Sequence, residues 1–154
     1  MKDVVISINS IHRLEDSEPD RIDFMTDGKY SFEDGTGYLS YMESEVTGLP
    51  GTRTSVEIRP DEVIVDRTGS ITSRMVFRRG EKNRFQYETP YGMATLGMST
   101  QRIRHDIGAK GGSVEIDYVL DVEHAVVERN RFCLNVREQL NFRMLFLDDE
   151  PRVF

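Results

Sequence analysis

The sequence contains a single cysteine, Cys133, no tryptophan and only three histidines among its 154 residues. One cysteine excludes an internal disulfide and a cysteine-rich zinc site. Cys133 lies in a strand-like segment, without the helix N-terminus that activates a thiol, so we interpret it as a buried, unreactive side chain. His12, His105 and His124 are scattered and match no metal-binding or nucleophile motif. We therefore expect neither a metal site nor catalytic residues of these types.

Long apolar runs are also missing. Segments such as residues 4–6, Val-Val-Ile, are far shorter than the roughly 18 apolar residues that span a bilayer. The N-terminal segment lacks the features of a secretory signal, so we expect a cytoplasmic protein without a membrane partner. Glycine-rich phosphate loops and the Gly-x-Ser-x-Gly nucleophile motif are absent, so nothing in the sequence indicates a cofactor or acyl-transfer chemistry.

The net charge of −7 argues against a general nucleic-acid binder, because neutralising phosphates requires an excess of Lys and Arg. The charge is uneven, since residues 72–110 carry 8 basic and 3 acidic side chains between two acidic flanks. Two interpretations remain open. The central third forms one positive face, or its cations pair with acidic neighbours across strands.

What the sequence does contain is a series of short segments in which apolar and polar residues alternate, the pattern of half-buried β-strands. Turn residues separate them, and no segment has a convincing helical period. The pattern predicts one all-β domain over residues 1–138, an up-and-down antiparallel β-barrel of about 8–10 strands, with an open sandwich as the alternative. The expected strands are 3–12, 21–32, 38–45, 52–59, 62–67, 72–80, 83–97 (one or two strands), 99–107, 113–121 and 131–138.

Several positions make this prediction more specific. Gly28, inside a long strand, indicates a bend or bulge that curls the sheet toward closure. Gly35 indicates a hairpin, and residues 123–130 are expected to form a longer turn. The tail, residues 139–154, fits both helical and strand periods and is too apolar to lie in water. We expect it to pack on the barrel or on a second subunit, which would make a homodimer.

Four segments carry a family resemblance: residues 38–45 (Tyr-Leu-Ser-Tyr-Met-Glu-Ser-Glu), 47–52 (Thr-Gly-Leu-Pro-Gly-Thr), 69–77 (Gly-Ser-Ile-Thr-Ser-Arg-Met-Val-Phe) and 87–92 (Tyr-Glu-Thr-Pro-Tyr-Gly). Together they resemble the uncharacterised bacterial YwiB-like proteins over about residues 3–138. The resemblance implies a lipocalin-like, calycin-type β-barrel in the cytoplasm, with no activity to transfer. The tail departs from the family pattern.

A barrel of this size encloses either packed side chains or one small ligand. Several polar side chains are expected on the inner face or at the rim, where an arginine near two carboxylates, walled by tyrosines, suits an anionic or amide ligand. The alternative is that Arg74 only pairs with Glu43 or Glu88 between strands. Met75, Met93 and Met98 suit an adaptable apolar pocket or fill an irregular core. The expected ligand-binding residues are Tyr41, Glu43, Arg74, Tyr87, Glu88 and Tyr91.

The leading hypothesis is a non-enzymatic barrel that binds one small, partly apolar ligand inside. A second hypothesis is an interaction module that holds a protein or RNA partner with the basic central strands or the tail. A third is a hydrolase in which Glu43 and Glu88 act as an acid and base pair.

Overall fold

The computed structural model describes residues 1–14 and 16–139, and within them ten strands and one short 3-10 helix. The alternation of β-branched and polar residues explains why the described part of the chain is built almost wholly of strands. The elements are β1 (Lys2–Leu14), β2 (Asp20–Glu33), β3 (Thr36–Met42), η1 (Glu45–Thr47), β4 (Arg53–Ile58), β5 (Val63–Thr68), β6 (Ser73–Phe77), β7 (Lys82–Thr89), β8 (Gly92–Gly108), β9 (Gly111–Val122) and β10 (Ala125–Glu138).

All ten strands belong to one antiparallel sheet with the order β6-β5-β4-β3-β2-β1-β10-β9-β8-β7. The first and last strands pair with each other at the centre of this order, from Val4 opposite Glu138 to Leu14 opposite Glu128. The two edges, β6 and β7, are consecutive in the chain and lie next to each other, so the sheet curls into a nearly closed barrel. The predicted up-and-down antiparallel barrel is confirmed.

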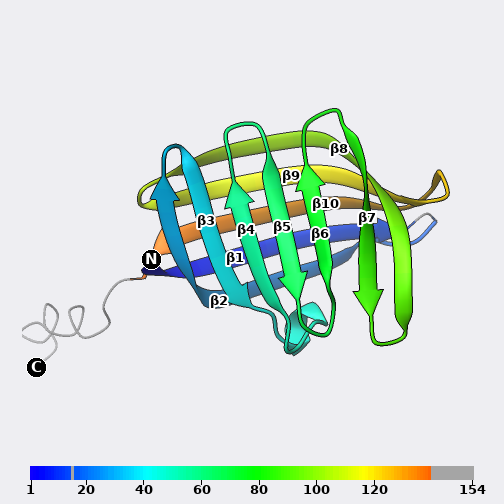
Figure 1. Cartoon of the computed structure of the whole chain (residues 1–154), viewed down its shortest axis with the longest axis horizontal. Helices are drawn as coiled ribbons and strands as arrows, with labels where there is room; N and C mark the ends of the chain where they lie inside the picture. The colour runs from blue at the N-terminus through cyan, green and yellow to red at the C-terminus, as the bar shows by residue number, and fades with distance from the viewer. Residues whose placement is uncertain (15, 140–154) are drawn as a thin grey trace, which may run out of the picture.

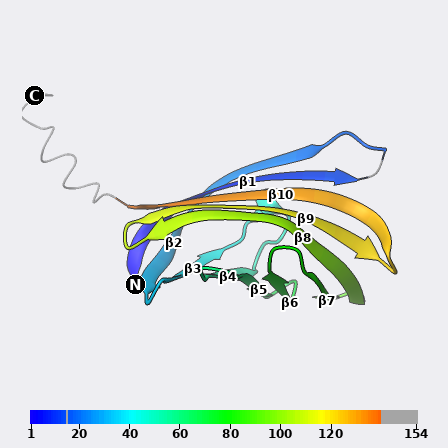
Figure 2. The same cartoon turned by 90° about the horizontal axis from the view of Figure 1, so that it is seen from above.

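The barrel is flattened into two layers that cross (Figure 1). The short strands β3 to β7 form one layer, and the long strands β8, β9, β10 and β1 form the other, as the view from above also shows (Figure 2). Strand β2 belongs to both, because residues 20–30 pair with β1 and residues 28–33 pair with β3. The corner therefore lies at Gly28, as expected, but both registers run through it without a bulge.

The barrel closes along a short seam between β6 and β7. One bridge joins the edges, in which the backbones of Thr72 and Glu88 exchange two hydrogen bonds of 2.9 Å. The Asn83 side chain adds a third contact by donating to the Val76 carbonyl oxygen at 2.8 Å. Within the described residues, this hairpin around Gly80 is the place where consecutive strands do not pair along their length.

The inward faces of both layers form one apolar core. Val4 and Ile6 of β1, Tyr30 of β2, Ile58 of β4 and Ile116 of β9 are fully buried. Burying each such side chain contributes about 1.5–3 kcal/mol. The Tyr30 hydroxyl donates to the carbonyl oxygen of Gly108 at 2.7 Å, which ties the corner strand β2 to the opposite layer.

The structure differs from the sequence expectations in two connections. Strand β10 begins at Ala125, because Glu123 and His124 alone make the turn, both with positive φ. Glu123 does not favour this conformation, and the two residues lack the glycine or asparagine that usually marks such a turn, so the sequence signal was weak. The residues expected to form strands 83–97 and 99–107 instead form β7 and one long strand, β8. Strand β8 has a register shift between Thr100 and Arg102.

The predicted packing of the tail falls outside the described residues, apart from Gln139, whose backbone amide donates to the Asp3 carbonyl oxygen at 3.1 Å. No helix in the described part of the chain has the length and apolar character needed to cross a membrane.

Replacing Gly28 by alanine should lower the free energy of unfolding by about 1–3 kcal/mol, the usual cost of overpacking a core. A Cβ there would collide with the Ile6 side chain and lie 2.6 Å from the Ser40 carbonyl oxygen. Urea denaturation measures the loss. Gly108→Ala is the matched control, because a Cβ at Gly108 has no atom within 4 Å. Equal effects of both substitutions would contradict the role of Gly28 as a packed corner.

Candidate functional site

A row of polar residues crosses the inner face of the short-strand layer. It lies next to the apolar core, two residues along each strand from it. Tyr41 of β3 lies opposite Thr54 of β4, Thr54 opposite Arg67 of β5, and Arg67 opposite Ser73 of β6. Two residues further along these strands, the facing side chains are Leu39, Val56, Val65 and Met75, all buried. The period of two thus places a polar layer directly on the core.

This polar layer forms part of a cavity of about 370 Å³ inside the barrel. Its walls come from both layers and from the loop after β3, which contributes Thr47 of η1 and Leu49. Within this loop the hydroxyl of Ser44 caps η1 by accepting from the Val46 amide. The apolar lining residues are Ile8, Ile22, Leu49, Met75, Phe85, Leu96, Leu120 and Phe132, and the polar ones are Ser10, His12, Tyr41, Glu43, Thr47, Arg67, Tyr87, Tyr118 and Glu128.

Glu43, which is buried, and Arg67, which is largely buried, form an ion pair in one wall. The Glu43 side chain is 3% exposed and that of Arg67 20% exposed. Arg67 Nε lies 3.9 Å from Glu43 Oε1, too far for a hydrogen bond. Oε1 instead accepts from the Thr54 hydroxyl at 2.7 Å. Arg67 Nε is buried without a hydrogen-bond partner in the described residues, and an Nη atom makes only a 3.7 Å contact with the Met75 sulfur.

Three tyrosines line the same cavity as this arginine. Burial, and then the charge of Glu43, raise the pKa of Tyr41 well above its usual range. Burial raises the pKa of Tyr118 to about 12, and it also raises the pKa of Tyr87. The positive charge of Arg67 opposes the shift in all three, so their hydroxyls share its field. All three therefore stay protonated at neutral pH and can donate hydrogen bonds.

A second polar group lies on the long-strand layer. His12 Nδ1 and Asn130 Oδ1 are 2.6 Å apart, and His12 Nδ1 lies 3.5 Å from the Glu128 carboxylate. Strand pairing fixes this arrangement, because His12 is directly opposite Asn130 in the register of β1 and β10. The cavity thus has one cation, Arg67, and two carboxylates, Glu43 and Glu128.

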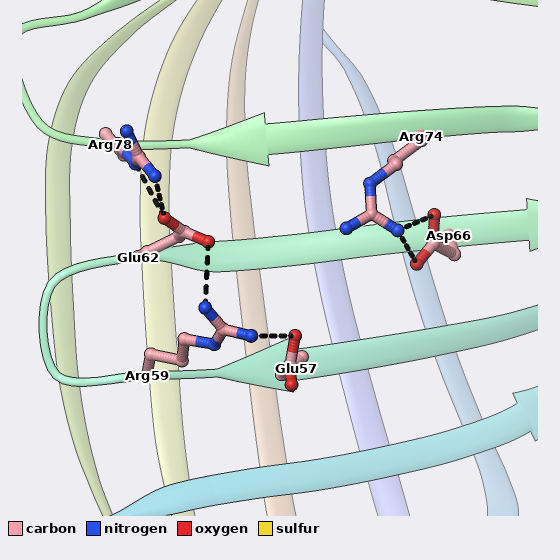
Figure 3. A network of polar contacts seen from close by, with 6 residues as sticks. All are labelled: Glu57, Arg59, Glu62, Asp66, Arg74 and Arg78. Atoms are coloured by element: carbon pink, nitrogen blue, oxygen red, sulfur yellow. Dashed lines mark hydrogen bonds and ion pairs between the residues drawn. The ribbon is translucent and has the colours of Figure 1, made fainter.

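The structure brings together three of the six side chains expected at the site and separates them from the others. Tyr41, Glu43 and Tyr87 line the cavity. Arg74 lies on the outer face, 62% exposed, and donates to Asp66 at 3.1 Å (Figure 3). Glu88 is exposed beside the seam, and Tyr91 is 99% exposed at a turn. These three side chains, expected on the inner face or at the rim, therefore do not line the cavity.

The predicted pairing of Arg74 with Glu43 or Glu88 is also replaced by the Asp66 contact. Since Glu43 is inside the barrel and Glu88 outside, the two carboxyls do not share a site, and the acid and base pair required for the hydrolase hypothesis is not formed.

Sequence analysis missed Arg67, Tyr118, His12 and Glu128. Arg67 carried a usable signal, because it shares its strand face with Val63 and Val65. The signal was blurred by Ile64, which is buried although it points to the other face. Tyr118 follows the same rule, sharing a face with Val114 and Ile116. His12 and Glu128 become neighbours only through the pairing of the first and last strands, which short-range patterns do not reveal.

The remaining sequence candidates lie elsewhere. Burial raises the pKa of the Cys133 thiol, which reduces its thiolate fraction. Of the three methionines, Met75 lines the cavity, Met98 is fully buried and Met93 is 60% exposed. Among the described residues no group of three or more His, Cys, Asp or Glu side chains is placed to hold a metal ion.

Several cations of the basic segment pair with acidic neighbours, in agreement with the second interpretation of its charge. Besides Arg74, Arg78 donates to Glu62 at 2.6 Å, and Lys82 lies 3.1 Å from Asp121. Glu62 also contacts Arg59 at 3.7 Å, so charges alternate across β4, β5 and β6 (Figure 3). A wide groove of about 1020 Å³ lies beside this network, at the other end of β5 from Arg67, and is lined by residues of both charges.

Comparisons with known proteins agree on one family. Residues 6–134 match the model of a domain of unknown function, DUF1934. The chain is 30% identical over 108 residues to the uncharacterised β-barrel protein YwiB of Bacillus subtilis (strain 168), which covers 70% of this chain and 75% of that protein. The crystal structure of a B. subtilis YwiB protein superposes with a TM-score of 0.79 over 90% of this chain and 93% of that one, at 24% identity.

The buried pair predicts energetic coupling between Glu43 and Arg67. Arg67→Met leaves the Glu43 charge buried without its cation, whereas Glu43→Gln together with Arg67→Met removes both charges. A double-mutant cycle by urea denaturation should give a coupling free energy of about 1–3 kcal/mol. The exposed pair Asp66 and Arg74 is the matched control and should give about 0–1 kcal/mol. A coupling for the buried pair no larger than the control would show that the two charges do not interact.

Proposed function

The chain belongs to the DUF1934 family of β-barrel proteins, and from the geometry of its interior we propose that it binds one small, partly apolar molecule in the cavity between its two layers. The residues that we propose contact the ligand are Tyr41, Glu43 and Tyr87 from the sequence analysis, together with Arg67 and Tyr118.

The composition of the cavity supports this proposal. Small-molecule sites are usually concave, of about 300–1,000 Å³, mostly apolar and supplied with a few converging polar groups. The 370 Å³ cavity has apolar side chains from β1, β2, β7, β8, β9 and β10, and its tyrosines and charged residues face the same space. Residues far apart in the sequence, such as Ile8, Arg67 and Phe132, form this one surface.

The observation that carries the proposal is the arginine inside the barrel. Removing a guanidinium from water is expensive unless its donors are satisfied, so a buried guanidinium nitrogen without a hydrogen-bond partner calls for an explanation. Arg67 Nε has no partner within the described chain, although the barrel interior next to it is apolar. A role restricted to stability would be served as well by apolar residues at both Arg67 and Glu43, which suggests that the pair is retained for a ligand.

The other functions considered from the sequence receive less support. The interaction hypothesis relies on basic central strands, yet Arg74, Arg78 and Lys82 are engaged by acidic side chains of the same molecule. Four expectations stay predictions. They are the use of the tail by that hypothesis, the homodimer, the cytoplasmic location and the lipocalin-like relationship.

A cavity-filling substitution tests the proposal. Ser10 lines the cavity and is 8% exposed, so Ser10→Phe should occupy the ligand space. Wild-type protein purified from cells without denaturation should show, by native mass spectrometry, an extra mass of a few hundred daltons that disappears on unfolding. Ser10→Phe should lack this mass.

Ser55→Phe is the matched control, because Ser55 is exposed on the outer face of β4. It should keep the extra mass, and circular dichroism should show that both variants are folded. Wild-type protein of bare mass, even after incubation with the small-molecule fraction of a cell lysate, would contradict the proposal, as would an equal extra mass in Ser10→Phe.

A further inference from the structure

The hydrogen-bonding state of the cavity walls indicates what kind of polar group a ligand needs. One of the two carboxylates in the cavity walls already accepts a hydrogen bond from the protein. Glu43 Oε1 accepts from the Thr54 hydroxyl at 2.7 Å and lies 3.9 Å from Arg67 Nε, and Glu128 lies 3.5 Å from His12 Nδ1. At Glu43, a ligand that offered only donors would compete with these protein contacts.

The donors, by contrast, lack acceptors. Arg67 Nε is buried without a partner in the described chain. The contact of an Arg67 Nη atom with the Met75 sulfur, at 3.7 Å, is weak because a thioether is a poor acceptor. Tyr87 and Tyr118 bring two further hydroxyls into the field of the same guanidinium. The arrangement therefore calls for a hydrogen-bond acceptor beside Arg67.

Charge and size narrow the class of this acceptor. Glu43 and Glu128 already place two carboxylates around the cavity, so a dianion such as a phosphate monoester would meet more repulsion than a monoanion. A carboxylate matches the planar fork of a guanidinium with two parallel hydrogen bonds. At about 30 Å³ per water, 370 Å³ holds about a dozen water-sized groups, so the molecule is compact.

Resting on the function proposed above, we infer that the ligand is a compact monocarboxylic acid with an apolar body, whose carboxylate binds Arg67 and whose body lies against the apolar walls formed by Phe85, Leu120 and Phe132. Glu43 does not contact the carboxylate in this arrangement. Its charge, 3.9 Å from Arg67 Nε, lowers the affinity for a second anion.

Three probes of equal length distinguish a carboxylate ligand from one that carries a hydroxyl or an ammonium group. They are 3-phenylpropionate, 3-phenylpropan-1-ol and 3-phenylpropylamine. Isothermal titration calorimetry with the full chain should show the acid binding at a ratio of one to one, and the alcohol and the amine binding at least about tenfold more weakly. Preference for the amine or the alcohol would overturn the inference.

Substitutions of Arg67 and Glu43 should change the affinity for the acid in opposite directions. Arg67→Met should weaken binding of the acid by about ten- to a hundredfold, the loss expected for hydrogen bonds to a charged group. Arg74→Met, the same substitution on the outer face, should leave it unchanged. Glu43→Gln should strengthen binding several-fold by removing a competing anion. Loss of affinity in Glu43→Gln, or full affinity in Arg67→Met, would overturn the inference.

Arg67→Met alone can unfold the protein by leaving Glu43 uncompensated, so the double variant Arg67→Met with Glu43→Gln, which buries no charge at this wall, provides the folded reference and should not bind the acid. Failure of the inference is distinguishable from failure of the proposed function. Absence of acid binding in a wild-type protein that still carries a mass from cells overturns only the ligand class. Absence of both overturns the proposed function as well.

Discussion

The pairing of β1 with β10 is the contact on which the rest of the structure depends. It joins the two halves of the chain, β1 to β6 and β7 to β10, which otherwise form two separate meanders. The pairing is long, from Val4 and Glu138 to Leu14 and Glu128, and its inward side chains Ile6, Ile8 and Leu134 are buried in the core. The seam between β6 and β7 has a single bridge. The barrel is therefore held together chiefly by the pairing of β1 with β10.

This constraint also assembles the candidate site. The short-strand layer supplies the ion pair, with Glu43 after β3 and Arg67 on β5, while the long strands supply Tyr118 and Glu128 from the other half of the chain. The polar groups face one another only when the layers are joined. The apolar core below them excludes water from one side, which makes the charge of Arg67 costly in the empty barrel and effective toward a bound anion.

Alternation along single strands was sufficient to predict the barrel, and Tyr41, Glu43 and Tyr87, expected on the inner face or at the rim, line the cavity. It failed for Arg74, which has the parity opposite to that of its inward neighbours Ser73 and Met75. To assign the inner face of β6, one must know which of its two alternating sets of side chains meets the core. The neighbours of Arg67 and Glu128 depend on register between strands distant in sequence, which local patterns do not contain. The turn at Glu123 and His124 lacked the usual glycine or asparagine.

We propose that the interior cavity is a binding site organised by Arg67 and not a packing defect of a structural barrel. A crystal structure of the full chain, purified from cells without denaturation, distinguishes the two. We expect density for one small organic molecule in the cavity, with an acceptor within hydrogen-bond distance of the Arg67 guanidinium. An interior filled by side chains, with Arg67 turned out to solvent, would contradict it.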